Sequence, residues 1–342
     1  MRYILYPFSI IYSLVIKIRN WLYDVNILKE KNFTIPIICV GNLAVGGTGK
    51  TPQVDYLINL LKKKYRTVLL SRGYKRKKSG FLYVDKNDYA KNFGDEPYLL
   101  KEKHPEIIVA VNNNRKKGIQ KILVDYPKTE VIILDDGFQH RKIKAGLNIL
   151  LTEYKYPFFN DFMLPFGTLR DNKKSYKRAD IIIATKCPTR INSKKFTEKI
   201  NLQINQEIYF SNINYNSWYC AFGKNKIKDF SRYNILLVTG IAKTYEFIKY
   251  LKSNSILKHL KFSDHHNYSE NNIRLIINTY SSMLDENKLI LTTEKDFVKI
   301  KSFINLFKGT NFYICPIEVN INESSKFENK IINYVKKNQR KR

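Results

Sequence analysis

The sequence predicts an α/β protein whose core is a doubly wound parallel sheet with helices on both faces (α/β/α). Three observations support this prediction. Short apolar runs rich in β-branched residues recur along the first half of the chain, several of them are separated by stretches with helical spacing, and a glycine-rich loop follows the first run. Such runs are typical of strands buried on both faces. Their alternation with helices favours parallel pairing.

The first run and the loop after it predict a nucleotide-binding site. Residues 35–40 form the apolar run, and the loop consists of Ala44, Val45, Gly46, Gly47, Thr48, Gly49, Lys50 and Thr51. Consecutive backbone N–H groups of such a loop bind phosphate, its lysine supplies a point charge, and its threonine hydroxyl ligates magnesium. The strict pattern has glycine where Ala44 stands, so the match is partial.

The segment after the loop has the features of a helix. Pro52 is tolerated in a first helical turn, and apolar residues then recur at helical spacing at Val54, Leu57, Ile58 and Leu61. A strand, a glycine loop and a helix in this order form the context that a phosphate-binding loop requires. The sequence therefore predicts that the chain binds a nucleoside triphosphate.

Further strands of the same sheet are expected at residues 67–70, 107–111, 131–134, 147–151 and 181–184, with helices at 97–103 and 115–124. The sequence turns polar and asparagine-rich near 190–230, and a second, smaller α/β unit is expected from the strand at 235–239 onward. Within it we expect a helix at 244–253, strands at 288–291 and 311–317, and a frayed basic tail at 336–342. The expected divisions are 1–30, an amino-terminal helix; 31–205, the nucleotide-binding domain; 206–230, a linker; 231–310, the second domain; and 311–342, a returning strand and tail.

The charge of the chain is extreme, with 60 Lys and Arg against 30 Asp and Glu and a formal net charge of +30. Such a balance attracts polyanions, whether nucleic acid, anionic lipid or a phosphorylated substrate. A compositional bias toward Lys, Asn, Ile and Tyr along the whole chain explains the positive charge equally well. The charge alone therefore does not identify the binding partner. The four cysteines lie far apart without metal-ligand spacing, which favours a reducing, cytoplasmic setting.

The amino terminus is an uncharged, mostly apolar stretch at residues 3–16, followed by Lys17, Arg19, Trp21 and Tyr23. It is shorter than the roughly 20 residues that cross a bilayer, and it has no cleavage site of a signal peptide. Aliphatic residues with aromatic and cationic residues at one end are typical of a helix that lies at a membrane surface. A helix packed on the core of the protein is the alternative.

Three acidic or histidine clusters follow predicted strands or precede helices. Asp135 and Asp136 end an apolar strand. An aspartate in this position, opposite a phosphate-binding loop, is typical of a magnesium ligand. Capping of the next helix is the alternative. Asp95 precedes a predicted helix, so it either caps that helix or acts on an acceptor hydroxyl. The loop at 264–266, Asp-His-His, offers a proton acceptor near neutral pH or is an ordinary surface loop.

The sequence also indicates which base the bound nucleotide carries. GTPases read guanine with Asn-Lys-x-Asp after a strand. The strand-following segments at 185–188, Thr-Lys-Cys-Pro, and 294–296, Glu-Lys-Asp, do not fit that pattern. ATP is therefore the expected nucleotide.

Taken together, these motifs resemble the tetraacyldisaccharide 4′-kinase family, the lipid A 4′-kinases. The resemblance rests on the loop at 41–52 and on segments at 71–74, Ser-Arg-Gly-Tyr; 94–97, Gly-Asp-Glu-Pro; 135–140, Asp-Asp-Gly-Phe-Gln-His; 164–170, Leu-Pro-Phe-Gly-Thr-Leu-Arg; and 262–266, Phe-Ser-Asp-His-His. They stand in the family's order and span nearly the whole chain. The family also lacks the first strict glycine, so Ala44 fits its variant. Phe166, Thr168 and Asp171 lie in a segment that the family varies.

The resemblance implies a reaction and catalytic residues. The γ-phosphate of ATP would pass to the 4′-hydroxyl of a tetraacyldisaccharide 1-phosphate, giving the bisphosphorylated lipid A precursor. Lys50 would hold the β- and γ-phosphates, and Arg170 would neutralise phosphate charge. Asp95 would act as the base on the acceptor hydroxyl, supported by His265, although His266 is left open. Two α/β/α domains joined by a short two-stranded hinge are also implied.

The implied cofactor is Mg²⁺, with Thr51 and Asp135 or Asp136 as ligands and Gln139 nearby. The expected partners are a glycolipid substrate and an anionic membrane surface, at the cytoplasmic face of the inner membrane and in a peripheral or monotopic manner. No nucleic-acid module or concentrated basic helix is recognisable in the sequence, so we expect no nucleic acid, and no obligate protein partner is evident. A P-loop kinase or ATPase that acts on a soluble substrate is the alternative.

Overall fold

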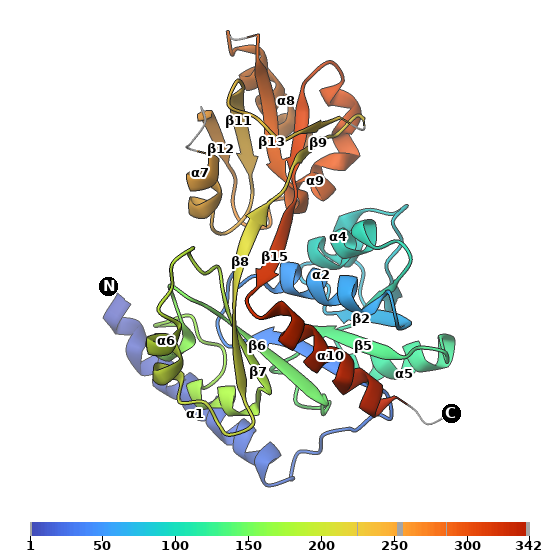
Figure 1. Cartoon of the computed structure of the whole chain (residues 1–342), viewed down its shortest axis with the longest axis vertical. Coiled ribbons are helices and arrows are strands. Elements are labelled where there is room, and N and C mark those ends of the chain that lie inside the picture. Colours follow the sequence, from blue (N-terminus) through green and yellow to red (C-terminus); the bar gives the residue numbers. More distant parts are fainter. Residues whose placement is uncertain (1, 224, 252–255, 285, 340–342) are drawn as a thin grey trace.

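The computed structural model describes residues 2–223, 225–251, 256–284 and 286–339. It contains a nine-stranded sheet and a six-stranded sheet, which Figure 1 shows one above the other. The order of the large sheet is β15-β8-β7-β6-β1-β5-β2-β4-β3. Its strands are β1 (Ile37–Asn42), β2 (Thr67–Ser71), β3 (Leu82–Tyr83), β4 (Ile108–Val111), β5 (Val131–Asp135), β6 (Leu147–Glu153), β7 (Ile181–Thr185), β8 (Glu207–Tyr215) and β15 (Ile317–Ile321).

Pairing in the large sheet is parallel from β4 to β8, and antiparallel only at the two edges, β3 and β15. Successive residues of β1 enter two different cores. Ile38 and Val40 pack in one cluster with residues of α2 (Lys50–Leu61), α4 (Asp95–Lys103) and α10 (Ser324–Asn338). Ile37 and Cys39 pack in the other with residues of α5 (Arg115–Asp125) and α6 (Ser193–Ile200). The predicted α/β class with helices on both faces of a mainly parallel sheet is therefore confirmed.

The strands expected at 67–70, 107–111, 131–134, 147–151 and 181–184 are all present, with ends that differ by at most two residues. The strand expected at 311–317 is instead two strands, β14 (Phe312–Cys315) and β15, which lie in different sheets. Pro316 separates them, because proline has no N–H with which to continue a ladder.

The expectation of a frayed tail from residue 336 was wrong for the described part of that segment. Residues 336–338 belong to α10, and residues 340–342 lie outside the described residues. Phe327, Ile331 and Val335 recur every four residues along α10 and are fully buried against the large sheet. The apolar stripe fixes the helix, because burial of one face provides most of the stability of a helix of this length.

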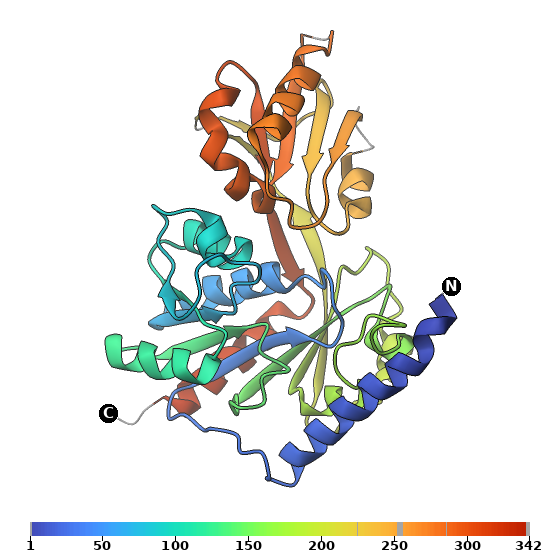
Figure 2. The same ribbon diagram turned by 180° about the vertical axis from the view of Figure 1, so that it is seen from behind.

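The smaller sheet has the order β10-β9-β14-β13-β11-β12. Its remaining strands are β9 (Trp218–Cys220), β10 (Lys226–Ile227), β11 (Asn234–Thr239), β12 (Ile256–Lys261) and β13 (Lys288–Thr293), with helices α7 (Tyr245–Leu251), α8 (Glu270–Ser281) and α9 (Glu294–Ile300). Residues 211–215 of β8 pair with residues 317–321 of β15, and this antiparallel ribbon joins the two sheets (Figures 1 and 2). The helix expected at 244–253 is α7; residues 252 and 253 lie outside the described residues.

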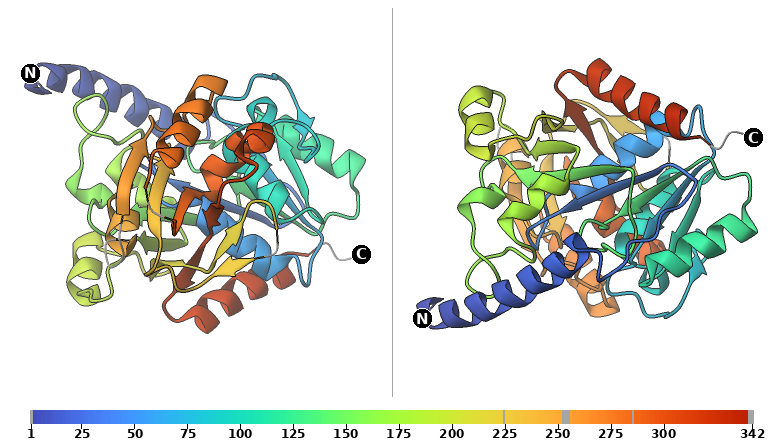
Figure 3. Two further views of the ribbon diagram at one scale, coloured as in Figure 1. Left: turned by 90° about the horizontal axis from the view of Figure 1, so that it is seen from above. Right: turned by 90° about the horizontal axis from the view of Figure 1, so that it is seen from below.

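Short helices complete the chain. They are η1 (Arg2–Leu5), α3 (Ala90–Phe93), η2 (Phe158–Asn160), η3 (Lys173–Arg178) and η4 (Lys301–Phe307). The amino-terminal helix α1 (Tyr6–Asp24) lies along the outside of the part that holds the large sheet, away from the smaller sheet (Figures 2 and 3). Within the described residues, no helix combines the length and the hydropathy needed to cross a membrane.

Candidate active site

The glycine loop forms a turn between β1 and α2, at the carboxyl end of the sheet's central strand. Gly46 and Gly49 have φ angles of +104° and +85°, a backbone region that side chains disfavour. Gly49 is the N-cap of α2, so the free N–H groups of the first helical turn face the loop. Lys186 at the end of β7 donates from Nζ to the carbonyl of Gly47, and Thr185 donates from Oγ1 to the carbonyl of Thr48 at 2.8 Å. These contacts hold the loop in a shape suited to phosphate.

Asn42 connects the loop to its charged neighbours. Its Nδ2 donates to Thr48 Oγ1 at 2.7 Å, and its Oδ1 accepts from Lys50 Nζ at 3.4 Å and from Arg170. The guanidinium of Arg170 also makes a two-pronged ion pair with Asp136, and Lys50 Nζ lies 3.6 Å from the same carboxylate. Burial raises the pKa of Asp136, but Arg170 and Lys50 outweigh it and hold the pKa below its ordinary value.

Arg170 belongs to a segment that lies directly on the loop. Its backbone N–H donates to the carbonyl of Leu43 at 2.8 Å, and Val45 donates to the carbonyl of Thr168 at 2.8 Å. The Nε of Arg170 is buried and has no partner within the described part of the chain. A donor thus remains for a further acceptor, such as a phosphate oxygen.

Asp135 lies on the other side of the same turn and is almost fully buried. It accepts a hydrogen bond of 2.9 Å from Ser71 Oγ at the end of β2. Burial, followed by the charge of Asp136, raises its pKa to about 6. Arg115 at the start of α5 approaches the carbonyls of both aspartates, with Nη2 at 3.4 Å from each oxygen. Burial lowers the pKa of Arg115 to about 10, so it stays protonated at neutral pH.

Asp95 and His265 come together from the two parts of the molecule. Asp95 begins α4, and His265 lies in the loop between β12 and α8 with a φ of +57°. His265 Nδ1 is 3.1 Å from Asp95 Oδ2, and its Nε2 is 3.1 Å from Lys295 Nζ. A lysine ammonium can only donate, so in the neutral ring Nε2 accepts from Lys295 and Nδ1 donates to Asp95. Glu96 Oε1 also lies 3.5 Å from Nε2.

Two lysines of α9 complete this cluster. Lys299 Nζ is nearly buried and lies 3.5 Å from Asp95 Oδ2, while Lys295 pairs with Glu96 at 2.8 Å. Burial raises the pKa of Asp95, but the hydrogen bond from His265 and the charge of Lys299 outweigh it and hold the pKa below its ordinary value. Asp95 is therefore ionised at neutral pH.

The structure distinguishes the two neighbouring histidines by position. His266 turns away from Asp95: its Nε2 is 3.0 Å from Asn272 Oδ1 near the start of α8, and its ring stacks on Phe262. Only His265 of the pair contacts Asp95. Gln139 lies close to the glycine loop, where its Nε2 donates to the carbonyl of Asn42 at 2.7 Å.

Several residues of the site were not identified from the sequence. They are Asn42, Ser71, Arg115, Lys186, Lys295 and Lys299. Asn42 and Ser71 stand at the carboxyl ends of strands, where functional side chains of such sheets gather, so their positions offered a signal. The positions of Lys295 and Lys299 in the sequence offered no such signal, because these lysines of α9 reach Asp95 and Glu96 only through the contact between α4 and α9.

The arrangement brings together a phosphate cradle at a helix N-terminus, the cations Lys50, Arg115 and Arg170 near it, and an ionised carboxylate hydrogen-bonded to a histidine. Cations and backbone N–H groups stabilise the charge on a transferring phosphoryl group, and a carboxylate can accept the proton of an attacking hydroxyl. The charge of Glu96 contributes to the raised pKa of Asp135, so the two clusters lie within electrostatic range of one another. The site is chemically suited to phosphoryl transfer.

Comparisons with known proteins agree with this chemistry. The family model described as tetraacyldisaccharide-1-P 4′-kinase matches residues 1–336. The tetraacyldisaccharide 4′-kinase of Flavobacterium johnsoniae is 43% identical over 99% of this chain and 98% of its own length. That of Flavobacterium psychrophilum is 45% identical over 98% and 97%. The crystal structure of LpxK from Aquifex aeolicus in complex with ATP has a TM-score of 0.77 and 32% identity, and covers 98% of this chain and 99% of that one. The chain belongs to the tetraacyldisaccharide-1-P 4′-kinase family.

Proposed function

We propose that this chain transfers the γ-phosphate of ATP to the 4′-hydroxyl of a tetraacyldisaccharide 1-phosphate, giving the bisphosphorylated lipid A precursor. Membership of the family and the likeness to an ATP complex support the donor and the class of acceptor. The observation that best supports the proposal is the contact between Asp95 and His265, because it pairs an ionised carboxylate with a histidine, and the charge of the adjacent Glu96 acts on Asp135 near the glycine loop.

In the proposed reaction, the 4′-oxygen forms a bond to the γ-phosphorus as the bond to the bridging oxygen of ADP breaks. Asp95 accepts the proton of the hydroxyl. The contacts of His265 and Lys299 within the described residues both fall on Oδ2 of Asp95, so Oδ1 is the oxygen that faces the acceptor in this proposal. Lys50 and Arg170 neutralise the charge of the phosphates, and the fixed geometry lowers the cost of bringing the reactants together.

A magnesium ion fits the turn between the glycine loop and β5. Asp135 is a buried carboxylate beside a second carboxylate, Asp136, and burial followed by the charge of Asp136 raises its pKa to about 6. Hard divalent cations prefer carboxylate and hydroxyl oxygens. We propose that Thr51 and Asp135 or Asp136 hold Mg²⁺ with Gln139 nearby, and that the ion neutralises phosphate charge.

Transfer of radiolabel from [γ-³²P]ATP to a tetraacyldisaccharide 1-phosphate in detergent micelles tests the function. We expect a product with one additional phosphate ester at the 4′ position, identified by mass spectrometry. Chelation of Mg²⁺ with EDTA is expected to abolish transfer, and added Mg²⁺ is expected to restore it. Label transfer that is unchanged in EDTA would contradict the magnesium proposal, and failure to phosphorylate the glycolipid would contradict the function.

We propose that the protein lies at the membrane surface, on the cytoplasmic side of the inner membrane where ATP is present. Helix α1 supports the contact with the membrane. Its outward side chains include Phe8, Ile11, Leu14, Ile18 and Trp21, each about half exposed or more. Exposed apolar surface on this scale is typical of an interaction site. An acylated substrate is itself anchored in the bilayer, so this helix would hold the active site where its acceptor lies.

Replacing Ile11 and Leu14 together by glutamate is expected to weaken partitioning onto anionic phospholipid vesicles by roughly tenfold or more, because two apolar side chains no longer enter the lipid. Cosedimentation with vesicles measures this effect. The matched control is Val124→Glu, which changes an exposed aliphatic residue of α5. Equal vesicle binding of the double variant and the control would exclude α1 as the membrane contact.

A further inference from the structure

Helix α1 has an inverted distribution of polarity. The side chains that face the rest of the protein include Ser9, Tyr12, Arg19 and Asn20, whereas most of the aliphatic residues face outward. Ile16 and Leu22 are partly buried, and Tyr23 is buried. Helices of soluble proteins usually bury the apolar face instead. Because hydrophobic contact has no direction, whereas hydrogen bonds fix distance and angle, a helix docked by polar side chains is held in a defined register.

Three polar side chains of α1, those of Ser9, Tyr12 and Asn20, contact the segment of residues 163–171. Ser9 Oγ donates to the carbonyl of Met163 at 3.1 Å and accepts from the N–H of Phe166 at 2.8 Å. Tyr12 donates from its hydroxyl to the carbonyl of Arg170 at 3.1 Å. The segment between these contacts also lies on the glycine loop, as described above.

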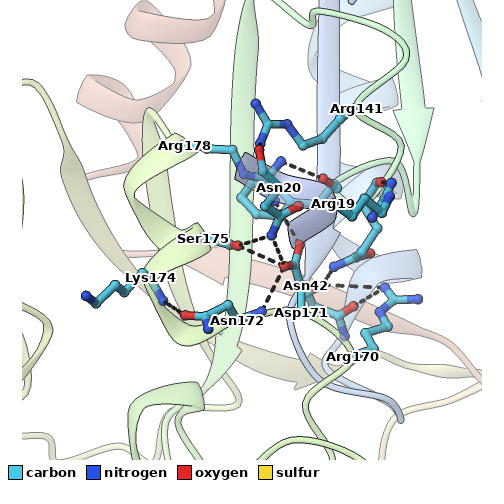
Figure 4. A network of polar contacts seen from close by, with 12 residues as sticks. Arg19, Asn20, Asn42, Arg141, Arg170, Asp171, Asn172, Lys174, Ser175 and Arg178 are labelled. Atoms are coloured by element: carbon cyan, nitrogen blue, oxygen red, sulfur yellow. Dashed lines mark hydrogen bonds and ion pairs between the residues drawn. The ribbon is translucent and has the colours of Figure 1, made fainter. Parts of the chain in front are cut away.

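The carboxyl end of the segment is held by a buried cluster centred on Asp171, which is 1% exposed (Figure 4). Asn20 Nδ2 donates to Asp171 Oδ1 at 2.9 Å, and Ser175 Oγ donates to the same oxygen at 2.8 Å. Arg178 forms an ion pair of 2.8 Å with the second oxygen. Asp171 thus connects α1 to η3 directly beside Arg170.

A second connection runs from α1 to the turn after β5. Arg19 Nη2 donates to the carbonyl of Gln139 at 2.6 Å, and the side chain of Gln139 in turn donates to the carbonyl of Asn42. Arg170 itself reaches Asn42 and Asp136. The inner face of α1 therefore contacts the backbone of Arg170 itself and, through Gln139, the backbone of Asn42, whose side chain Arg170 binds.

We propose that Tyr12 and Asn20 are positioning residues for Arg170, so that the helix with the apolar outer face also sets the geometry of the phosphate site. Tyr12 fixes the backbone carbonyl of Arg170, and Asn20 fixes the next residue through Asp171. This inference rests on the proposed role of Arg170 in neutralising phosphate charge. In this proposal, the apolar outer face of α1 contacts the membrane and its polar inner face positions Arg170.

The test compares Tyr12→Phe, Asn20→Ala and the double variant in micellar phosphate transfer and in vesicle cosedimentation. Loss of hydrogen bonds that hold a charged group is expected to lower kcat by about three- to tenfold for each single variant. Vesicle binding and the KM for glycolipid should stay at the wild-type values. Ser13→Ala is the matched control, because Ser13 is half-buried on α1 and its side chain makes no hydrogen bond within the described residues; its kcat should equal that of the wild type.

A double-mutant cycle with Arg170→Ala separates positioning from general loss of structure. In the Arg170→Ala background, Tyr12→Phe and Asn20→Ala should have no further effect on kcat. Tyr12→Phe keeps the ring and its packing, so it remains informative if Asn20→Ala fails to fold. Fully additive effects, or wild-type kcat in Tyr12→Phe and Asn20→Ala, would overturn the inference while the proposed function stands. Wild-type kcat in Arg170→Ala would instead refute the proposed role of Arg170, and the inference with it.

Discussion

The Asp95→Asn enzyme is expected to phosphorylate glycolipid about 10²–10⁴ times more slowly than the wild type, because a positioned base contributes a factor of that size. Asparagine keeps the volume and can still contact His265, but it cannot accept the proton of the 4′-hydroxyl. ATP affinity should not fall comparably, since Asp95 lies outside the phosphate cradle. Single-turnover transfer and ATP titration measure the two quantities.

Glu102→Gln is the matched control for this substitution. Glu102 lies on the same helix and forms an ion pair with Lys301, so its replacement also removes a carboxylate from the contact between the two parts of the chain. Exposed ion pairs contribute little to stability, and we expect near-wild-type kcat. If Asp95→Asn turned over at the rate of Glu102→Gln, Asp95 would not be the base.

The second large effect is expected for Lys50→Ala. Lys50 lies at the start of α2, beside Asn42 and Asp136, and we propose that its ammonium holds the β- and γ-phosphates. Removing one preorganised group that stabilises transition-state charge costs about 10²–10³ in kcat. In contrast to Asp95→Asn, the variant should also bind ATP more weakly.

Steady-state kinetics with varied ATP concentration give both kcat and the KM for ATP of Lys50→Ala. Lys63→Ala is the appropriate comparison, because Lys63 is an exposed cation just beyond the other end of α2. It removes the same charge from the chain without touching the glycine loop. Equal KM for ATP and equal kcat in the two variants would mean that Lys50 does not contact the nucleotide.

Features with a local cause could be predicted from the sequence. The glycine loop, the apolar strands on both sides of it and the aspartates at the end of β5 depend on neighbours within a few residues. The residue types themselves indicate the backbone conformation. Glycine at positions 46 and 49, for example, permits the positive φ angles that the loop adopts. The sequence motif also placed Asp95 at the start of a helix, although it left capping and catalysis as alternatives.

Features with a long-range cause could not be predicted in this way. Lys299 acts on Asp95 across 204 positions of the chain, and no periodicity encodes that contact. The choice between His265 and His266 likewise depends on the turn of one loop, in which His265 takes a left-handed backbone conformation. Helix α10 was overlooked for a different reason: its many charges hid the apolar stripe of Phe327, Ile331 and Val335.

The ribbon of β8 and β15 has a consequence for how such an enzyme can be assembled. Tyr215 and Ile317 are direct partners across the ribbon, so the chain leaves the large sheet and returns to it at one place. Residues 216–316 are thus a contiguous insertion in a hairpin of the nucleotide-binding host. The host carries Lys50, Asp95 and Arg170, and the insert contributes His265. If Asp95 and His265 act on the acceptor as proposed, that chemistry is shared between two modules, and the host alone retains the glycine loop with Lys50 and Arg170.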